Sequence, residues 1–95
     1  SLLAGAILQS RVAEFDYIDA RNRRTHRRVA ALRLWFKSHV WYLEAYCFER
    51  RAFRVFRLPR IHDIRLLEET FERAALPAQP SPEEAPGPPH EHERP

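Results

Sequence analysis

The sequence of 95 residues predicts a mainly β fold, in which a small sheet closes into a barrel beside a short N-terminal helix. Apolar and polar side chains alternate in successive runs, as in strands with one buried face. One long run changes phase midway, which indicates a bent strand of the kind that closes a small sheet. Seven of the eight prolines follow Leu76. The folded part is therefore predicted as one domain, residues 1–76.

The N-terminal part predicts a short helix and then a strand. The first nine residues carry apolar side chains at the helical spacing: Leu2, Leu3, Ile7 and Leu8. From Val12 the period becomes two, so that Ala13, Phe15 and Tyr17 share one face of a strand. Residues 19–23 then supply turn chemistry, with Asn22 the candidate for a left-handed conformation. A hairpin into a second strand follows.

The second strand, residues 25–37, contains the phase change. Val29 lies on the odd positions, whereas Leu32, Leu34 and Phe36 lie on the even ones. An inserted residue near Ala30 and Ala31 reconciles the two patterns and predicts a β-bulge that bends the strand. A tight turn at residues 38–39 leads into the third strand.

The third strand, residues 40–48, is apolar on both faces. One face carries Trp41, Leu43, Ala45 and Cys47, and the other carries Tyr42, Tyr46 and Phe48 together with Glu44. Such a strand is central and covered twice. We expect the barrel interior to cover one face and the N-terminal helix to cover the other.

The last two elements are a predicted fourth strand and a segment whose pattern fits either a helix or a strand. Residues 53–58 alternate arginine with aromatic and aliphatic side chains and predict a fourth strand, which Pro59 ends. Residues 61–71 fit helical spacing through Ile61, Ile64, Leu67 and Phe71. Ile64 and Leu66 also fit a short strand, and periodicity alone slightly favours the helix.

The charge is divided between the domain and the tail. Residues 1–76 carry a net charge of +6, residues 20–60 within them +10, and residues 77–95 a net charge of −3. Lys37 is the single lysine, so nearly all the positive charge is guanidinium, which binds phosphate and carboxylate in a fork and stacks on rings. Part of the arginine excess is also what a GC-rich genome produces. The clustering favours an anionic partner.

Several classes of function are excluded or made improbable. With two glycines no glycine-rich phosphate loop can form, and no nucleophile or acid/base pair indicates an enzyme. The single Cys47 excludes an intrachain disulfide, and the histidines lack metal-ligand spacing. The longest apolar run, residues 2–8, is too short to span a bilayer. We expect a cytoplasmic protein with no cofactor, no metal and no membrane contact, and since the chain opens on Ser1, a fragment of a longer one.

Two motifs give the sequence a family resemblance. Trp41-Tyr42-Leu43 is followed by Ala45-Tyr46, and ten residues later by Phe53-Arg54-x-Phe56-Arg57-Leu58-x-Arg60-Ile61. Together with Phe15-x-Tyr17 in the first strand, they resemble the WYL domain over about residues 2–73. The resemblance implies a five-stranded Sm-like or SH3-like barrel that senses a ligand behind a helix-turn-helix domain of a bacterial transcriptional regulator. It also favours a strand over residues 64–67, which we adopt.

The sequence departs from the family pattern at three places. Ala30-Ala31 replaces a common Val-x-Pro element, Ser38-His39 replaces a glycine-containing turn, and Glu44 replaces a small or aliphatic residue. Glu44 shares a face with Tyr42 and Tyr46, where a carboxylate would repel phosphate. We therefore expect Arg54 or Arg57 to neutralise it.

The candidate ligand-binding residues follow from the resemblance and from the charge pattern: Arg54, Arg57, Arg60, Tyr42 and Tyr46. Arginines would bind phosphate and the two tyrosines would stack on bases of single-stranded DNA or RNA or of a nucleotide effector. A secondary basic cluster on the first hairpin includes Arg23 and Arg27, which alternation places on one face. An alternative is a protein-interaction or homodimerisation module without a nucleic-acid ligand.

The C-terminal segment, residues 77–95, is rich in proline and glutamate and predicts a disordered tail. Its acidic side chains also allow it to compete weakly for the basic surface.

Overall fold

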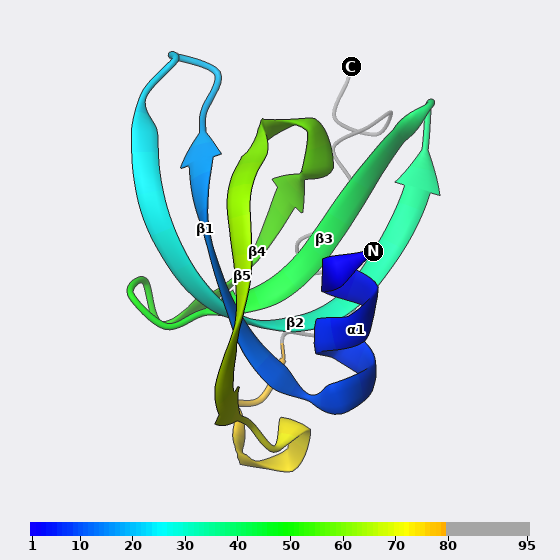
Figure 1. Cartoon of the computed structure of the whole chain (residues 1–95), viewed down its shortest axis with the longest axis vertical. Coiled ribbons are helices and arrows are strands. Elements are labelled where there is room, and N and C mark those ends of the chain that lie inside the picture. Colours follow the sequence, from blue (N-terminus) through cyan, green and yellow to red (C-terminus); the bar gives the residue numbers. More distant parts are fainter. Residues whose placement is uncertain (80–95) are drawn as a thin grey trace.

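The structure, a computed structural model, describes residues 1–79 and contains one helix, five strands and two short 3-10 turns in that range (Figure 1). In chain order they are α1 (Leu2–Gln9), β1 (Arg11–Ile18), β2 (Arg24–Lys37), β3 (Val40–Cys47), β4 (Ala52–Arg57), η1 (Leu58–Arg60), β5 (Ile61–Thr70) and η2 (Arg73–Ala75). The strands form one antiparallel sheet in the order β4-β3-β2-β1-β5. The predicted mainly β fold with a short N-terminal helix is confirmed.

The sheet curls so that its two edges approach each other. β4 and β5 are at opposite ends of the strand order, yet η1 joins them through only three residues. The Cα atoms of Arg57 and Ile61, which flank this connection, are therefore at most about 14 Å apart, because each extended residue covers about 3.3–3.6 Å. The Tyr17 hydroxyl of β1 accepts a hydrogen bond from the Arg57 backbone N–H at the end of β4, at 3.0 Å. The curled sheet is evident in Figure 1.

The bend in β2 is the bulge that the phase change predicts. Ala31 pairs with Ala45 and Arg33 pairs with Glu44, so Leu32 is the extra residue, one position beyond the predicted site. The bulge lets Val29 and Ala31 on one side of it and Leu34 on the other contribute to the same core.

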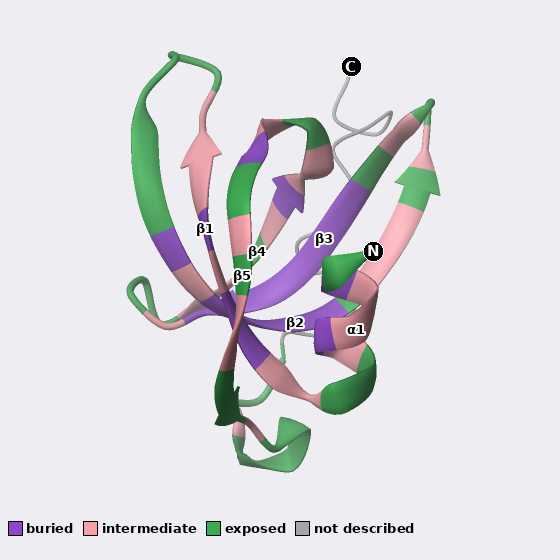
Figure 2. Ribbon diagram, viewed as in Figure 1, coloured by how far each residue is buried: buried purple, intermediate pink, exposed green. Residues whose placement is uncertain are grey.

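The core fills the inside of the curled sheet. Side chains from α1 and all five strands meet there: Leu3, Ala6, Ala13, Phe15, Val29, Ala31, Leu43, Ala45, Cys47, Phe56 and Ile61. The Phe56 ring lies edge-on to Phe15 and Tyr17, with ring centres 5.2 and 5.0 Å apart. These contacts join β4 to β1 across the interior. Figure 2 shows the buried residues along the middle of β2 and β3.

The expectation that the N-terminal helix covers the outer side of β3 is wrong. α1 packs against β1, β2 and β5, because its apolar side chains Leu3 and Ala6 enter the core cluster. The outer side of β3 is instead contacted by the segment after β5, where the Gln79 side-chain amide donates a hydrogen bond to Glu44.

Residues 61–70 form a strand, as the family resemblance implies and contrary to the periodicity. Against β1, Glu14 pairs with Arg65 and Asp16 with His62, so β5 has one extra residue there. Asp63 sits at this irregularity with a φ of 57°. A bulge turns the two-residue repeat of a strand into a three-residue spacing between Ile61 and Ile64, which imitates a helix.

The turns also agree with their prediction. Asn22 has a φ of 64°, and Ser38 and His39 have φ values of 53° and 65°. The predicted domain boundary at residue 76 remains a prediction. Pro77 to Gln79 lie against the sheet, and residues 80–95 of the predicted tail are outside the described residues.

Candidate ligand-binding surface

The outer side of β3, with the second half of β2 and with β4, forms a surface that we call the aromatic face. Residues directly opposite each other in antiparallel strands point to the same side of a sheet. The register therefore arranges the face in three rows across β2, β3 and β4: Trp35, Tyr42 and Arg57; Arg33, Glu44 and Val55; Ala30, Tyr46 and Phe53.

The first row places a tyrosine between an indole and a guanidinium group. The rings of Trp35 and Tyr42 stack with centres 6.1 Å apart and planes 29° apart. The Arg57 guanidinium lies 5.8 Å from the centre of the Tyr42 ring, and that of Arg33 lies 4.5 Å from the Trp35 ring. Within residues 1–79 the buried indole Nε1 of Trp35 has no hydrogen-bond acceptor. The row thus contains one cation, Arg57, and an indole donor without an acceptor among these residues, and Arg33 of the second row lies beside it.

The second row contains a buried carboxylate. Glu44 is only 5% exposed, and its Oε1 accepts a hydrogen bond from Arg33 Nε at 3.0 Å. The expectation that Arg54 or Arg57 neutralises Glu44 is wrong. Because of the bulge, Arg33 stands directly opposite Glu44, whereas Arg57 stands opposite Tyr42.

Arg57 is the cation of this face without a carboxylate. It is half-buried, and none of the ion pairs among residues 1–79 includes it. Within residues 1–79 its guanidinium therefore combines a ring contact with hydrogen-bond donors that no acceptor engages. Such a group is suited to a phosphate or another oxyanion.

The three arginines predicted to act together lie in different places. Arg54 is opposite Ala45, so it belongs to the inner side of β4, although its side chain is exposed at the edge of the sheet. Arg60 is in η1 and donates from Nη1 to the Ile18 carbonyl at 3.5 Å. Only Arg57 points to the aromatic face. Alternation along β4 and the turn of η1 separate the three groups.

The two predicted stacking tyrosines are on the aromatic face but are covered. Tyr42 is 2% exposed, and Tyr46 is 8% exposed with its ring edge-on to Phe48 and Phe53 at 5.5 and 5.2 Å. Direct stacking of a base on either ring requires a neighbouring side chain to move, so this role remains a prediction. Trp35, whose half-buried ring lies beside them, is not among the residues predicted from the sequence. Its odd-numbered position after the bulge, which places it on the same face as Tyr42, is the signal that could have identified it.

Arg23 and Arg27 of the secondary cluster are not brought together. Arg23 pairs with Asp19 at 2.9 Å at the tip of the first hairpin. Arg27 is 8% exposed and turns into the barrel, where its guanidinium lies 5.5 Å from the Phe56 ring and 5.9 Å from the Tyr17 ring. Arg27 is thus largely a core residue.

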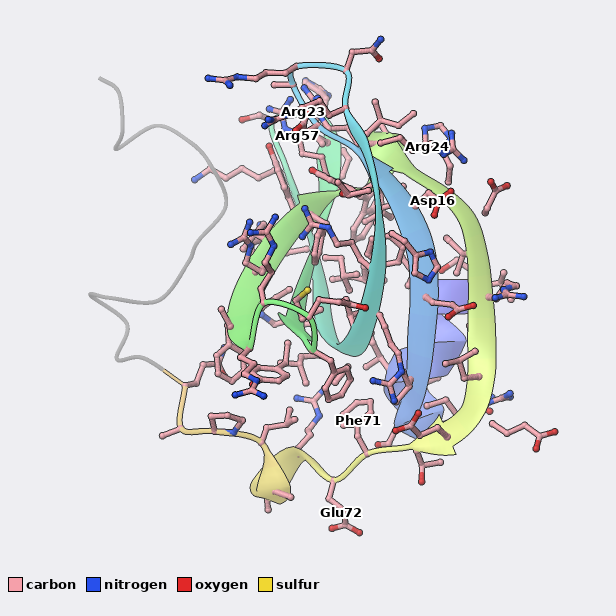
Figure 3. The ribbon with its side chains drawn as sticks, turned by 90° about the vertical axis from the view of Figure 1, so that its left-hand side faces the viewer. Asp16, Arg23, Arg24, Arg57, Phe71 and Glu72 are labelled. Carbon is pink, nitrogen blue, oxygen red and sulfur yellow. The ribbon has the colours of Figure 1, made fainter. Side chains whose placement is uncertain are left out.

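The outer side of β1, the first half of β2 and β5 forms a second polar surface, which we call the paired face. Arg24 binds Asp16 at 2.9 Å and Asp63 at 2.8 Å, and His26 Nδ1 lies 3.0 Å from Asp16. Figure 3 shows Arg24 and Asp16 together at this edge. Two more pairs, Arg28–Glu69 and Arg65–Glu14, extend the network. Hydrogen bonds from His26 and then Arg24 lower the pKa of Asp16 below its usual value.

The part of the chain that the structure describes contains no candidate metal site and no helix that could span a membrane. No group of three His, Cys, Asp or Glu side chains is placed to hold a metal ion in residues 1–79. No helix in this range is long and apolar enough to cross a membrane.

Comparison with known proteins places the fold and its motifs in a family. The family model of the WYL domain matches residues 1–66. The chain belongs to the WYL domain family, as the Trp41-Tyr42-Leu43 motif indicates.

Two proteins are similar to this chain in sequence or in structure. The chain is 35% identical over 71 residues to an uncharacterized HTH-type transcriptional regulator, YobV, of Bacillus subtilis, covering 75% of this chain and 23% of that protein. Among solved structures, proteasome accessory factor B/C (PafBC) of Arthrobacter aurescens matches with a TM-score of 0.74 and 30% identity, over 85% of this chain and 13% of that one. The chain thus spans about a quarter of YobV and less of PafBC.

Proposed function

We propose that this WYL domain is the effector-sensing part of a bacterial transcriptional regulator and that its ligand is single-stranded nucleic acid or a nucleotide. The membership in the family and the similarity to an HTH-type regulator support the regulatory role. A helix-turn-helix domain elsewhere in the parent chain would read the operator in the cytoplasm. Ligand binding would favour one arrangement of two protomers and thereby change operator affinity.

The observation that carries the ligand class is the first row of the aromatic face. Arg57 has no carboxylate partner among residues 1–79, and it lies beside the stacked rings of Tyr42 and Trp35. Phosphate accepts hydrogen bonds from guanidinium groups, and aromatic rings stack with bases irrespective of sequence. Arg33 adds a second cation above Trp35. A phosphate on Arg57 fits this arrangement, and its base would stack on the rings once a side chain that covers them, such as Arg33 over Trp35, moves aside.

Fluorescence anisotropy with a short labelled single strand and its duplex, at about 50 and 200 mM salt, tests the proposal. Arg57→Ala should weaken single-strand binding several-fold and reduce the salt slope by about one. Arg24→Ala is the matched control, because it removes the same charge from the paired face, where Asp16 and Asp63 already neutralise it. Equal effects of the two substitutions would contradict the assignment of the ligand to the aromatic face.

A protein-interaction module, including a homodimer, is the second candidate, and the tip of the β2–β3 hairpin favours it. Phe36 and Trp41 are 54% and 47% exposed, and their ring centres are 5.2 Å apart. Exposed aromatic pairs are typical of contact sites. If light scattering shows a dimer that Trp41→Ser dissociates while Arg57→Ala leaves nucleic-acid binding unchanged, this candidate replaces the first.

A further inference from the structure

The segment after β5 forms a strap over the part of the aromatic face that contains Glu44 and Phe53. We define the strap as residues 71–79, which include η2. It is anchored at its start by the Phe71 backbone N–H, which donates to the Ser10 carbonyl at 2.9 Å. Arg73 donates to the Leu32 carbonyl and Gln79 to Glu44. No residue of the strap is fully buried, so few contacts hold it in place.

A pocket of about 280 Å³ separates the strap from the sheet. Leu32 and the Phe53 ring form its side on the sheet, and Arg73, Leu76 and Gln79 are among the strap residues that close it. The volume is near the lower end of small-molecule sites, which begin at about 300 Å³. Leu32 and Phe53 offer apolar and aromatic contacts, and Arg73 and Gln79 offer polar ones, a combination that suits a flat heterocycle.

The contact between Gln79 and Glu44 indicates which heterocycles would bind in this pocket. Glu44 is nine-tenths buried or more, and Arg33 occupies its Oε1, so Oε2 is the acceptor that remains. The –NH₂ group of the Gln79 carboxamide satisfies that oxygen. Cytosine, adenine and guanine each carry an exocyclic amino group of the same kind, whereas thymine and uracil carry carbonyl oxygens there.

We propose that Glu44 selects nucleobases with an exocyclic amino group, and that Gln79 occupies the place of that group when no ligand is bound. The inference rests on the proposed function, because the base enters as part of a nucleotide whose phosphate lies on the Arg57 row. The strap is then an internal competitor: the base replaces Gln79 at Glu44, takes the pocket beside Leu32 and Phe53, and releases the end of the strap.

The test compares oligo-dC and oligo-dT of equal length by anisotropy with the full chain. Both are pyrimidine strands with the same backbone, so phosphate contacts cancel in the ratio. The wild type should bind oligo-dC about tenfold more tightly, as expected for one hydrogen bond to a charged acceptor. Glu44→Gln should bring the ratio close to one, because its amide can donate to the thymine O4 as well as accept from cytosine.

A second variant keeps the test independent of the folding of Glu44→Gln. Gln79→Ala removes the competitor and should raise the affinity for oligo-dC about threefold, with that for oligo-dT unchanged. Gln9→Ala is the matched control, since it makes the same substitution at an exposed site on α1.

The outcomes separate the two proposals. If both oligonucleotides bind equally to the wild type, or if a preference survives Glu44→Gln and Gln79→Ala leaves the oligo-dC affinity unchanged, the selection by Glu44 is wrong while the proposed function stands. If neither oligonucleotide binds, the proposed function is wrong and the inference falls with it.

Discussion

The two polar faces of this small sheet contain similar residues but differ in how their charges are balanced. On the paired face Arg24, His26, Arg28 and Arg65 each contact at least one carboxylate. On the aromatic face the buried carboxylate of Glu44 pairs with Arg33, and the Arg57 guanidinium lies over the Tyr42 ring with no carboxylate partner among residues 1–79. Within residues 1–79 the paired face is internally neutralised, whereas the aromatic face has an excess of positive charge.

The difference shows why arginine count alone is a poor guide to a ligand site. Many of the arginines in residues 20–60 are used within the fold, as Arg23, Arg24 and Arg28 are in ion pairs and Arg27 is over core rings. Exposed ion pairs contribute little to stability, typically 0–1 kcal/mol, but they leave no charge for a partner. A cation that the fold leaves unpaired is the informative one.

The largest expected effect on stability concerns Arg33. Arg33→Ala leaves Glu44 buried with one partner fewer, so the free energy of unfolding should fall by about 1–3 kcal/mol. Arg24→Ala, on the paired face, should lower it by less than about 1 kcal/mol. Urea denaturation of both variants measures the difference. Equal losses would show that the burial of Glu44 does not distinguish the two faces.

The next effect concerns ligand binding at Trp35. Trp35→Leu removes the half-buried ring between Arg33 and Tyr42 and should weaken single-strand binding about five- to tenfold, which corresponds to about 1 kcal/mol of stacking. Trp41→Leu, at the exposed hairpin tip, is the matched control and should leave affinity within about twofold. A larger loss for Trp41→Leu would move the contact surface to the hairpin.

The smallest effect is a pH-dependent one on the paired face. The pKa of Asp16 is lowered in the folded state by His26 and Arg24, so its ionised form stabilises the fold above the unfolded pKa of about 3.9. This contribution is lost as the pH falls through the lowered folded-state value. Asp16→Asn should therefore lower the melting temperature slightly at pH 7, and the difference should shrink as the pH falls below about 3.9. A difference that does not change with pH would show that hydrogen-bond geometry, not ionisation, is responsible.

Most of the fold could be predicted from the sequence, because alternation reports burial directly. Phe15 and Tyr17 in β1 and Leu43 and Ala45 in β3 follow the simple pattern and enter or pack against the core. β5 could not be read in this way, since its irregularity near Asp63 changes the spacing of apolar residues. The segment that covers the outer side of β3 could not be predicted either, because the strap has no periodic pattern of apolar residues and no buried residue.

The candidate site was predictable only in part. Tyr42 and Arg57 were identified as single residues, but their contact depends on the register between β3 and β4. The pairing of Arg33 with Glu44 depends on the exact position of the bulge at Leu32. Composition and residue spacing do not specify the register between strands. The sequence alone therefore could not show that Arg57 lies opposite Tyr42 or that Arg33 lies opposite Glu44.

An NMR titration of the domain with a short single-stranded oligonucleotide tests most directly whether the aromatic face binds the ligand. The chain has two tryptophans, so the indole N–H groups of Trp35 and Trp41 serve as reporters of the aromatic face and of the hairpin tip. Large, saturable shifts are expected for the Trp35 indole and for the amides of Tyr42 and Arg57, with little change at Asp16, Arg24 and His26. Shifts concentrated on the paired face, with the Trp35 indole unchanged, would contradict binding at the aromatic face.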